Sequence, residues 1–308
     1  MIRFFFLILL HLSLILSNSW IYDYNNPWDI NKDSRSSALG GIDLNPYFDL
    51  DSRSIHIFNS NMFNNIISYN NIYYKEQFDP QIILGNTFEE VKIGFLNRSI
   101  NNIKNTSLIW DSQDLNEPVL SEFNYDLIDY YDHRDIALSI FLPFTNSIGD
   151  FGLDIKPSFL KIDKYSAKSI SLDLMYFKEI INGLSIMLSI DNLLSYRKWS
   201  NNSVERFYPE LQVLTNVKFN DINFFIEIDN MYTNYNFIVN DYDLLDNISL
   251  GIEHFFNDRL NLRIGSSKYY NTFGFGLKIG DFIIDYSYLE HEKLDFSNQF
   301  SITYLIKD

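Results

Sequence analysis

The sequence predicts an all-β protein, an antiparallel transmembrane β-barrel of the outer-membrane kind. Three observations predict it: an apolar N-terminal export signal, no later apolar run long enough for a membrane helix, and many segments in which apolar and polar residues alternate. An exported chain without a spanning helix can enter a membrane only as a closed barrel, because strand edges cannot stay unpaired in lipid.

The first residues have the order of a secretory signal peptide. Met1-Ile2-Arg3 supplies a short basic region, an apolar stretch runs from Phe4 to Leu16, and Ser17-Asn18-Ser19 offers small residues for cleavage. A single transmembrane anchor is the alternative, but the apolar stretch is shorter than the roughly 20 residues that a spanning helix needs. We therefore expect residues 1–19 to be removed, with cleavage after Ser19.

Period-two alternation is the main signal for strands, because a strand between two environments places its apolar residues at every second position. In residues 221–229, for example, Ile222, Phe224, Ile226 and Ile228 alternate with polar residues, and only Phe225 breaks the pattern. Comparable runs occupy residues 136–142, 151–164, 170–176, 184–190, 259–265, 273–279, 282–288 and 300–306.

Short turn sequences separate these runs. Asn182-Gly183, Asn257-Asp258 and Gly280-Asp281 are each typical of a tight hairpin turn. At about 10 residues per spanning strand, residues 51–308 allow roughly 12 to 14 strands in one barrel domain. The final amphipathic run, residues 300–306, suits a strand that closes the barrel.

Two segments fit the scheme less well. Pro157 lies inside the strand-like stretch 151–164 and predicts a bulge or a strand end there, because proline cannot donate a ladder hydrogen bond. Residues 101–131 lack clean alternation and are rich in aspartate, which favours long acidic loops on the outer face or a poorly patterned hairpin.

The lumen is expected to be narrow or plugged. Ile283 and Phe225 share a strand face with Asp285 and Glu227, so the inner wall mixes apolar and polar residues and differs from the charged channel of a wide porin. Residues 20–50 precede the first convincing strand and are long enough to fold into such a lumen as a plug.

Composition excludes several kinds of site. The chain has no cysteine, which rules out disulfides, thiolate nucleophiles and cysteine metal sites. It carries 40 acidic against 24 basic residues, a formal net charge of −16, so nucleic acid is not expected as a partner. The 27 phenylalanines and 21 tyrosines suit the aromatic girdles of a membrane barrel; a soluble β-sandwich or an AT-rich genome would account for them equally.

No catalytic residue, cofactor-binding residue or metal ligand is predicted, and we expect a protein that is not an enzyme. The sequences Asp132-His133-Arg134 and Glu290-His291-Glu292 are interpreted as polar strand ends or loops, and His56 and His254 stand in no catalytic pattern. The acidic cluster Asp241-Tyr242-Asp243 with Asp246 lacks the spacing of a dedicated Ca²⁺ loop.

Three stretches, in order, resemble one known family. Residues 34–42 (Ser-Arg-Ser-Ser-Ala-Leu-Gly-Gly-Ile) are similar to its opening motif, residues 159–167, 172–174 and 188–193 to its central hairpins, and residues 273–278, 285–288 and 300–304 to its closing strands. The family is the PorV/PorQ-type outer-membrane proteins of the FadL-like barrel class, and this chain is closer to the PorQ-like side. The resemblance assigns a structural role to the motif residues Ser36, Ala38, Leu39, Gly40 and Gly41.

The resemblance implies a barrel of about 14 strands, integral to the outer membrane, with membrane lipid as its surroundings. It also implies an accessory role in type IX protein secretion, with other secretion-system proteins or exported cargo as partners and no cofactor. The alternative is a FadL-like conduit for hydrophobic small molecules, in which the N-terminal segment gates the lumen.

Overall fold

A computed structural model describes residues 20–21, 28, 33–44, 53–63, 65–106, 125–229, 247–268, 270–291 and 293–307. The predicted signal peptide, its cleavage position at Ser19 and the acidic cluster around Asp241 fall outside these residues. Apart from strands, they contain the helix α2 (Ser34–Ala38) and the 3₁₀ helix η3 (Tyr125–Leu127). No helix among them has both the length and the apolarity needed to cross a membrane.

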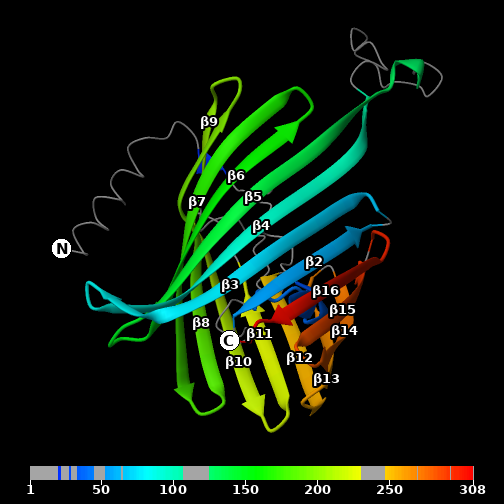
Figure 1. The fold of residues 1–308 in the computed structure, drawn as a ribbon. Helices are drawn as coiled ribbons and strands as arrows, with labels where there is room; N and C mark the ends of the chain where they lie inside the picture. The colour runs from blue at the N-terminus through cyan, green and yellow to red at the C-terminus, as the bar shows by residue number, and fades with distance from the viewer. Residues whose placement is uncertain are drawn as a thin grey trace, which may run out of the picture.

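Fourteen antiparallel strands form a closed barrel, as the sequence predicts (Figure 1). In chain order they are β2 (Ser54–Met62), β3 (Ile67–Ile83), β4 (Asn86–Asn105), β5 (Asp129–Thr145), β6 (Asp150–Ile162), β7 (Tyr165–Ile181), β8 (Leu184–Trp199), β10 (Glu210–Phe219), β11 (Ile222–Ile228), β12 (Ile248–Asn257), β13 (Leu260–Ser266), β14 (Tyr270–Ile279), β15 (Phe282–His291) and β16 (Ser297–Leu305).

The barrel closes where its last strand meets its first. β16 pairs antiparallel with β2, from Asn298 opposite Asn61 to Leu305 opposite Ser54. The expectation that the terminal amphipathic strand closes the sheet is therefore confirmed. Closure removes both free strand edges, so their backbone N–H and C=O groups form hydrogen bonds with each other. Lipid could not have supplied those bonds.

One part of the wall is irregular. β8 pairs with β10 up to Asp191 and then, at Arg197 and Lys198, with the short strand β9 (Val204–Phe207). Between these two ladders the Ser195 hydroxyl accepts a hydrogen bond from the Phe207 N–H (2.8 Å) and donates one to the Phe207 carbonyl (3.2 Å). The outer edge of β9 carries β1 (Trp20–Ile21) in parallel.

The alternation seen in the sequence separates lipid-facing from lumen-facing side chains. On β14, Phe273 and Phe275 lie on the outer wall and are 52% and 38% exposed. Thr272, which alternates with them on the same strand, faces the lumen and is 4% exposed. Most apolar residues of the predicted runs thus face the membrane. The inner wall is built from the residues that alternate with them.

Aromatic side chains form rows on the outer wall, as expected for membrane girdles. Across β4 to β7, the rings of Phe88, Phe144, Phe151 and Tyr176 follow one another with centroids 5.4, 5.5 and 5.0 Å apart. Neighbouring strands therefore contribute one continuous band of rings near one end of the barrel.

The two ends of the barrel differ in their connections. At one end the chain turns tightly at Leu84-Gly85, Asn182-Gly183, Asn220-Asp221 and Gly280-Asp281, and β2 begins and β16 ends there. At the other, the upper end in Figure 1, β4 and β11 end and β5 and β12 begin, with longer stretches of sequence between them, and we name it the long-connection end. Short turns face the periplasm in outer-membrane barrels, so this second end of the barrel faces outward.

Pro157 lies inside β6, where the sequence predicts a bulge or a strand end. Pro157 makes no bulge, because β6 continues through it in register with β7. Only the pairing to β5 lapses, at residues 156 and 157, where the missing N–H of proline removes a donor.

Two other local predictions are refined by the structure. The turn expected at Asn257-Asp258 falls at Asp258-Arg259, beside a register shift between Phe255 and Asn257. In the stretch 101–131, strands extend to Asn105 and resume at Asp129, and residues 107–124 lie outside the description.

From the structure of the outer wall we predict how an added charge affects stability near the middle of the membrane and near the outer end of the barrel. Ile57 and Asn61 face outward on the same strand, and Ile57 is flanked by Ile72 and Ile302. Ile57→Arg should lower the free energy of unfolding from lipid vesicles by about 2–4 kcal/mol, and Asn61→Arg, near the outer end, by about 1 kcal/mol or less. Urea titration measures both; equal losses would contradict the assigned membrane position.

Candidate functional site in the lumen

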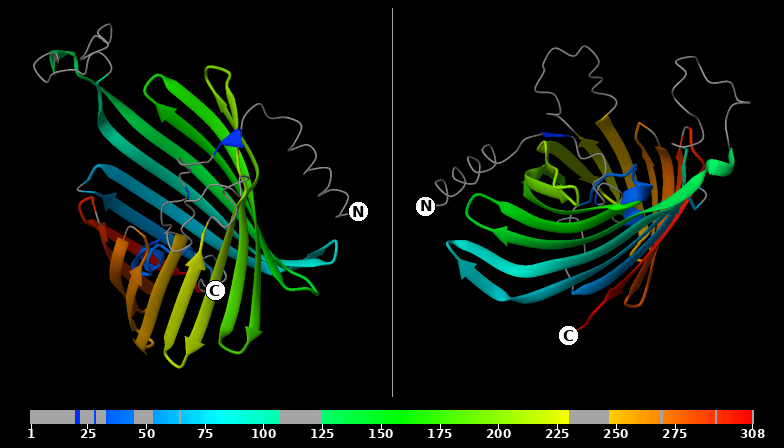
Figure 2. Two further views of the ribbon diagram at one scale, coloured as in Figure 1. Left: turned by 180° about the vertical axis from the view of Figure 1, so that it is seen from behind. Right: turned by 90° about the horizontal axis from the view of Figure 1, so that it is seen from above.

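The segment from Asp33 to Leu44 lies inside the barrel, and we name it the lumen segment. Its helix α2 begins with Asp33, whose side chain accepts a hydrogen bond from the Ser36 N–H at 2.6 Å. α2 contacts β13 to β16, and Figure 2 shows it in blue beside these strands. Ser36, Ser37, Ala38 and Leu39 are at most 2% exposed.

Inward glycines on three neighbouring strands make room for this segment. A Cβ atom at Gly251 would lie 2.8 Å from the Leu39 carbonyl oxygen, and one at Gly274 would lie 2.6 Å from the Ala38 Cβ. At Gly265 it would overlap the backbone of Leu39 and Gly40. Only glycine permits so close an approach of two backbones.

Direct hydrogen bonds hold the segment to the wall. The Gly40 N–H donates to the Thr272 hydroxyl (2.9 Å), which in turn donates to the Ala38 carbonyl (3.0 Å). Further along, the Asp43 N–H donates to a carboxylate oxygen of Glu227 (2.9 Å). Gly40 also has a φ of +84°, a conformation that favours glycine.

Four charged side chains join the helix to the wall, and we name them the ionic quartet: Arg35, Glu253, Arg263 and Asp285. Arg35 donates through Nε (3.0 Å) and Nη2 (2.7 Å) to the two carboxylate oxygens of Glu253. Arg263 donates to Glu253 (2.8 Å) and to Asp285 (2.6 Å). Two positive charges thus face two negative ones, which compensates their removal from water.

Apolar residues pack on both sides of the lumen. Leu39, Ile42 and Leu44 form one buried cluster with side chains of the wall, namely Met187, Leu214 and Phe225. A second cluster lies on the inner wall of β2 to β5 and includes Trp28; its wall residues are Phe58, Tyr69, Tyr73, Leu96 and Ala137. The lumen therefore contains two packed apolar clusters in addition to its charged quartet.

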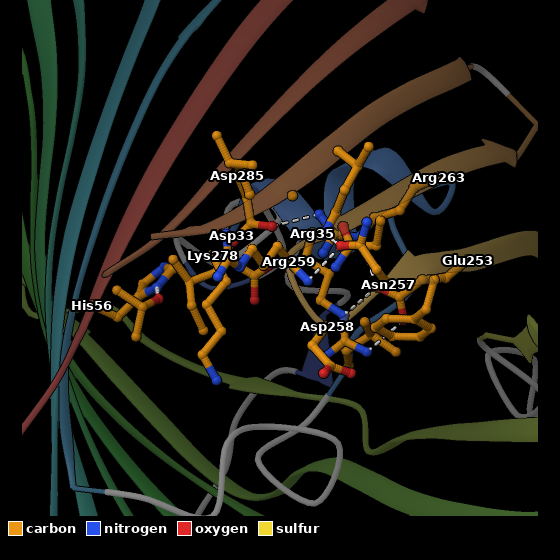
Figure 3. A pocket seen from close by; sticks show the side chains of 18 of the residues that line it. Asp33, Arg35, His56, Glu253, Asn257, Asp258, Arg259, Arg263, Lys278 and Asp285 are labelled. Carbon is orange, nitrogen blue, oxygen red and sulfur yellow. Dashed lines mark hydrogen bonds and ion pairs between the residues drawn. The ribbon is translucent and has the colours of Figure 1, made fainter. Parts of the chain in front are cut away.

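A cavity of about 520 Å³ lies next to the quartet (Figure 3). Its lining includes the quartet itself, and it reaches the short-turn end, where Asp258, Arg259 and Lys278 surround it. His56 on β2 and Tyr73 on β3 line it beyond β16, and the Lys92 ammonium lies 4.8 Å from the Tyr73 ring centroid. The remaining lining is partly apolar, with Leu44, Phe255, Leu260, Leu277 and Ile283.

The wall formed by β3 to β8 is more charged than predicted from the closing strands. Arg98 forms an ion pair with Asp135, Lys156 with Asp173, and Lys75 with Glu90, the last at 3.0 Å. Five of these six side chains are less than 10% exposed. Each of these three pairs joins opposite charges, so this part of the wall is charged but locally neutral.

The histidines have structural contacts. His133 is not in a polar loop as expected; it lies within β5, is buried, and contacts Asp135 through Nε2 at 3.1 Å. His56 Nδ1 lies 2.8 Å from the Thr303 hydroxyl, and His291 Nδ1 accepts the Lys293 N–H. Within the described ranges, no three histidine or acidic side chains are grouped as a metal site.

The structure brings together the residues that the resemblance singled out. Ser36, Ala38, Leu39, Gly40 and Gly41 all lie in the lumen segment. Sequence reasoning missed the partners that hold it, above all Glu253 and the inward glycines. One signal in the sequence could have identified them as lumen-facing residues. On consecutive strands they alternate with apolar residues that face outward.

Comparison with known proteins gives the fold but no family. The sequence matches no protein-family model and no curated protein. Its structure is similar to the Pseudomonas putida toluene transporter TodX, with 9% identity, a TM-score of 0.54 and coverage of 92% of this chain and 98% of that one. Omp33 of Acinetobacter baumannii aligns with 5% identity, a TM-score of 0.39 and coverage of 83% and 98%.

The chain is an integral outer-membrane β-barrel. Its fold is similar to that of TodX, which is in line with the barrel class that the resemblance implied. The PorV/PorQ assignment stays a prediction.

A test of the lumen segment uses the contact at Gly265. Gly265→Ala should displace the segment, because the new methyl group overlaps the backbone of Leu39 and Gly40. Overpacking of this kind costs typically 1–3 kcal/mol, so tryptic cleavage after Arg35 should become about tenfold faster. The barrel should keep its heat-dependent gel mobility. Unchanged cleavage after Arg35 would show that the segment is not seated against β13.

Proposed function

We propose that this protein is a gated conduit for small hydrophobic molecules and catalyses no reaction. The lumen segment is the gate: it occupies the lumen and is held by the ionic quartet, hydrogen bonds and one apolar cluster. The observation that carries the proposal is the bidentate contact of Arg35 with Glu253, which fastens the lumen segment to the barrel wall at β12.

An open lumen would offer suitable surfaces for such a molecule. Both apolar clusters are packed in the structure, and displacement of the lumen segment would uncover Met187, Leu214 and Phe225 of the wall, on which an apolar body can rest. The cavity beside the quartet, about 520 Å³, falls within the usual range of about 300–1,000 Å³ for small-molecule sites. Displacement of the lumen segment would join these surfaces to the cavity and to the short-turn end.

The similarity to TodX supports the proposal only through the fold. TodX is described as a toluene transporter, and the two chains share a barrel with little sequence identity. The substrate class proposed for this chain therefore depends on its own apolar clusters. The cavity volume of about 520 Å³ suits a molecule with one or two rings or a single alkyl chain.

The accessory role in type IX secretion stays a prediction from the sequence resemblance. No contact or surface among the described residues is specific to exported cargo. Recovery of cargo C-terminal sorting domains with the purified barrel from cell envelopes would favour that role. Their absence would leave the conduit as the better account.

Opening of the gate can be tested with two arginine variants. Arg35→Gln removes the charge that binds Glu253, and Arg53→Gln is a matched control near the same end, where Arg53 contacts Tyr74 and Glu76. Hydrogen bonds to charged groups are worth about 1.5–3 kcal/mol, so Arg35→Gln should raise the open population about tenfold or more.

The measurement is the rate at which a hydrophobic dye, 1-N-phenylnaphthylamine, crosses the outer membrane of host cells that produce each protein. Uptake should rise with Arg35→Gln and stay at the wild-type rate with Arg53→Gln, without release of periplasmic enzyme. If no variant exceeds cells without the barrel, the conduit proposal is wrong.

A further inference from the structure

Basic side chains gather on one part of the outer wall. Arg134 on β5, Lys161 on β6, Lys168 on β7 and Lys198 on β8 all face outward near the long-connection end, and we name these four the basic rim. All four are exposed. Such a cluster is unexpected in a chain with a formal net charge of −16.

The basic rim places like charges opposite one another. Arg134 is the direct register partner of Lys161, and Lys168 is the partner of Lys198. Like charges at opposite positions on neighbouring strands destabilise a sheet. Among the described residues, no carboxylate forms an ion pair with any of the four, and Asp132 on the same face accepts the Asn102 N–H instead. The arrangement calls for an anionic partner from outside the chain.

The surface directly below the rim is apolar. Ile170 and Tyr196 are register partners next to the Lys168 and Lys198 pair, and are 47% and 38% exposed. These four side chains line a shallow hollow of about 500 Å³ on the outer wall, together with Ser200 and Asn202 of the following turn. Positive charge thus lies directly above a surface that faces the hydrocarbon of the membrane.

The same height elsewhere on the barrel lacks this charge. Outward residues near the corresponding ends of the other strands are mostly uncharged, and one is acidic: Asn61, Asn70, Asn97, Asn271, Glu290 and Asn298. Lysines that merely extend their ends from lipid into water would be expected all around the barrel. Apart from Lys104 near the end of the neighbouring strand β4, the outward lysines and arginine that the described strands carry at this end lie on β5 to β8, which indicates a localised site.

We propose that the basic rim binds the phosphate groups of a phosphorylated glycolipid of the outer leaflet, whose acyl chains lie on Ile170 and Tyr196. Lysine ammonium groups bind phosphate as point charges, and a bound phosphate between Lys168 and Lys198 removes their mutual repulsion. An anionic headgroup with attached acyl chains matches both halves of the surface. This inference concerns the outer wall and is independent of the proposed conduit.

The test compares two double variants of the folded protein purified from outer membranes. Lys168→Gln with Lys198→Gln removes half of the rim, and Lys178→Gln with Lys218→Gln makes the same charge change at the short-turn end, where both lysines are exposed. Native mass spectrometry measures binding of bisphosphorylated lipid A and of its dephosphorylated form. Gel mobility with and without heating verifies that each variant is folded.

The rim variant should bind bisphosphorylated lipid A about tenfold or more weakly than wild type, because each lysine near an anionic headgroup contributes to binding. The control variant should bind like wild type, and dephosphorylated lipid should bind weakly to all three. Equal binding by the rim variant and wild type would overturn the proposal. So would equal binding of the two lipids, or displacement of lipid A by millimolar inorganic phosphate.

Discussion

Lipid cannot hydrogen-bond to a backbone, and this constraint determines the rest of the structure. The chain satisfies it by pairing β16 with β2, which leaves no free edge in the barrel. Closure also gives every strand a lipid face and a lumen face. Ile57 on β2 and Ile72 on β3 consequently point outward. The residues that alternate with them along each strand face the lumen and must find partners there.

The inner wall meets this requirement by pairing charges and by accepting a segment of the chain itself. Glu253 is buried and lies between Arg35 and Arg263, so one carboxylate links the lumen segment to two strands. The lumen segment also requires glycine at positions 251, 265 and 274, because side chains there would keep Leu39 and Gly40 away from the wall. The proposed gate is held by these polar contacts and by the buried cluster of Leu39, Ile42 and Leu44, so its opening must break both.

Much of the fold could be predicted because the lipid face imposes a local, two-residue period. Runs such as 273–279 and 300–306 carry that period and became β14 and β16. The lumen contacts could not be predicted in this way, because they join residues distant in sequence: Arg35 and Glu253 are 218 positions apart. The motif of Ser36 to Gly41 indicated where the segment lies, but not its partners. Pro157 shows that a strand tolerates a missing donor when its register is fixed on both sides.

The central claim is that the lumen segment is a folded part of the closed barrel. Backbone hydrogen exchange of the protein in lipid nanodiscs tests it most directly, at the amides of Ser36, Gly40, Gly41 and Asp43, each of which donates a hydrogen bond. We predict strong protection at all four amides, within the range seen for β12 to β14. Exchange at the rate of an unstructured peptide, with the strands still protected, would contradict the account.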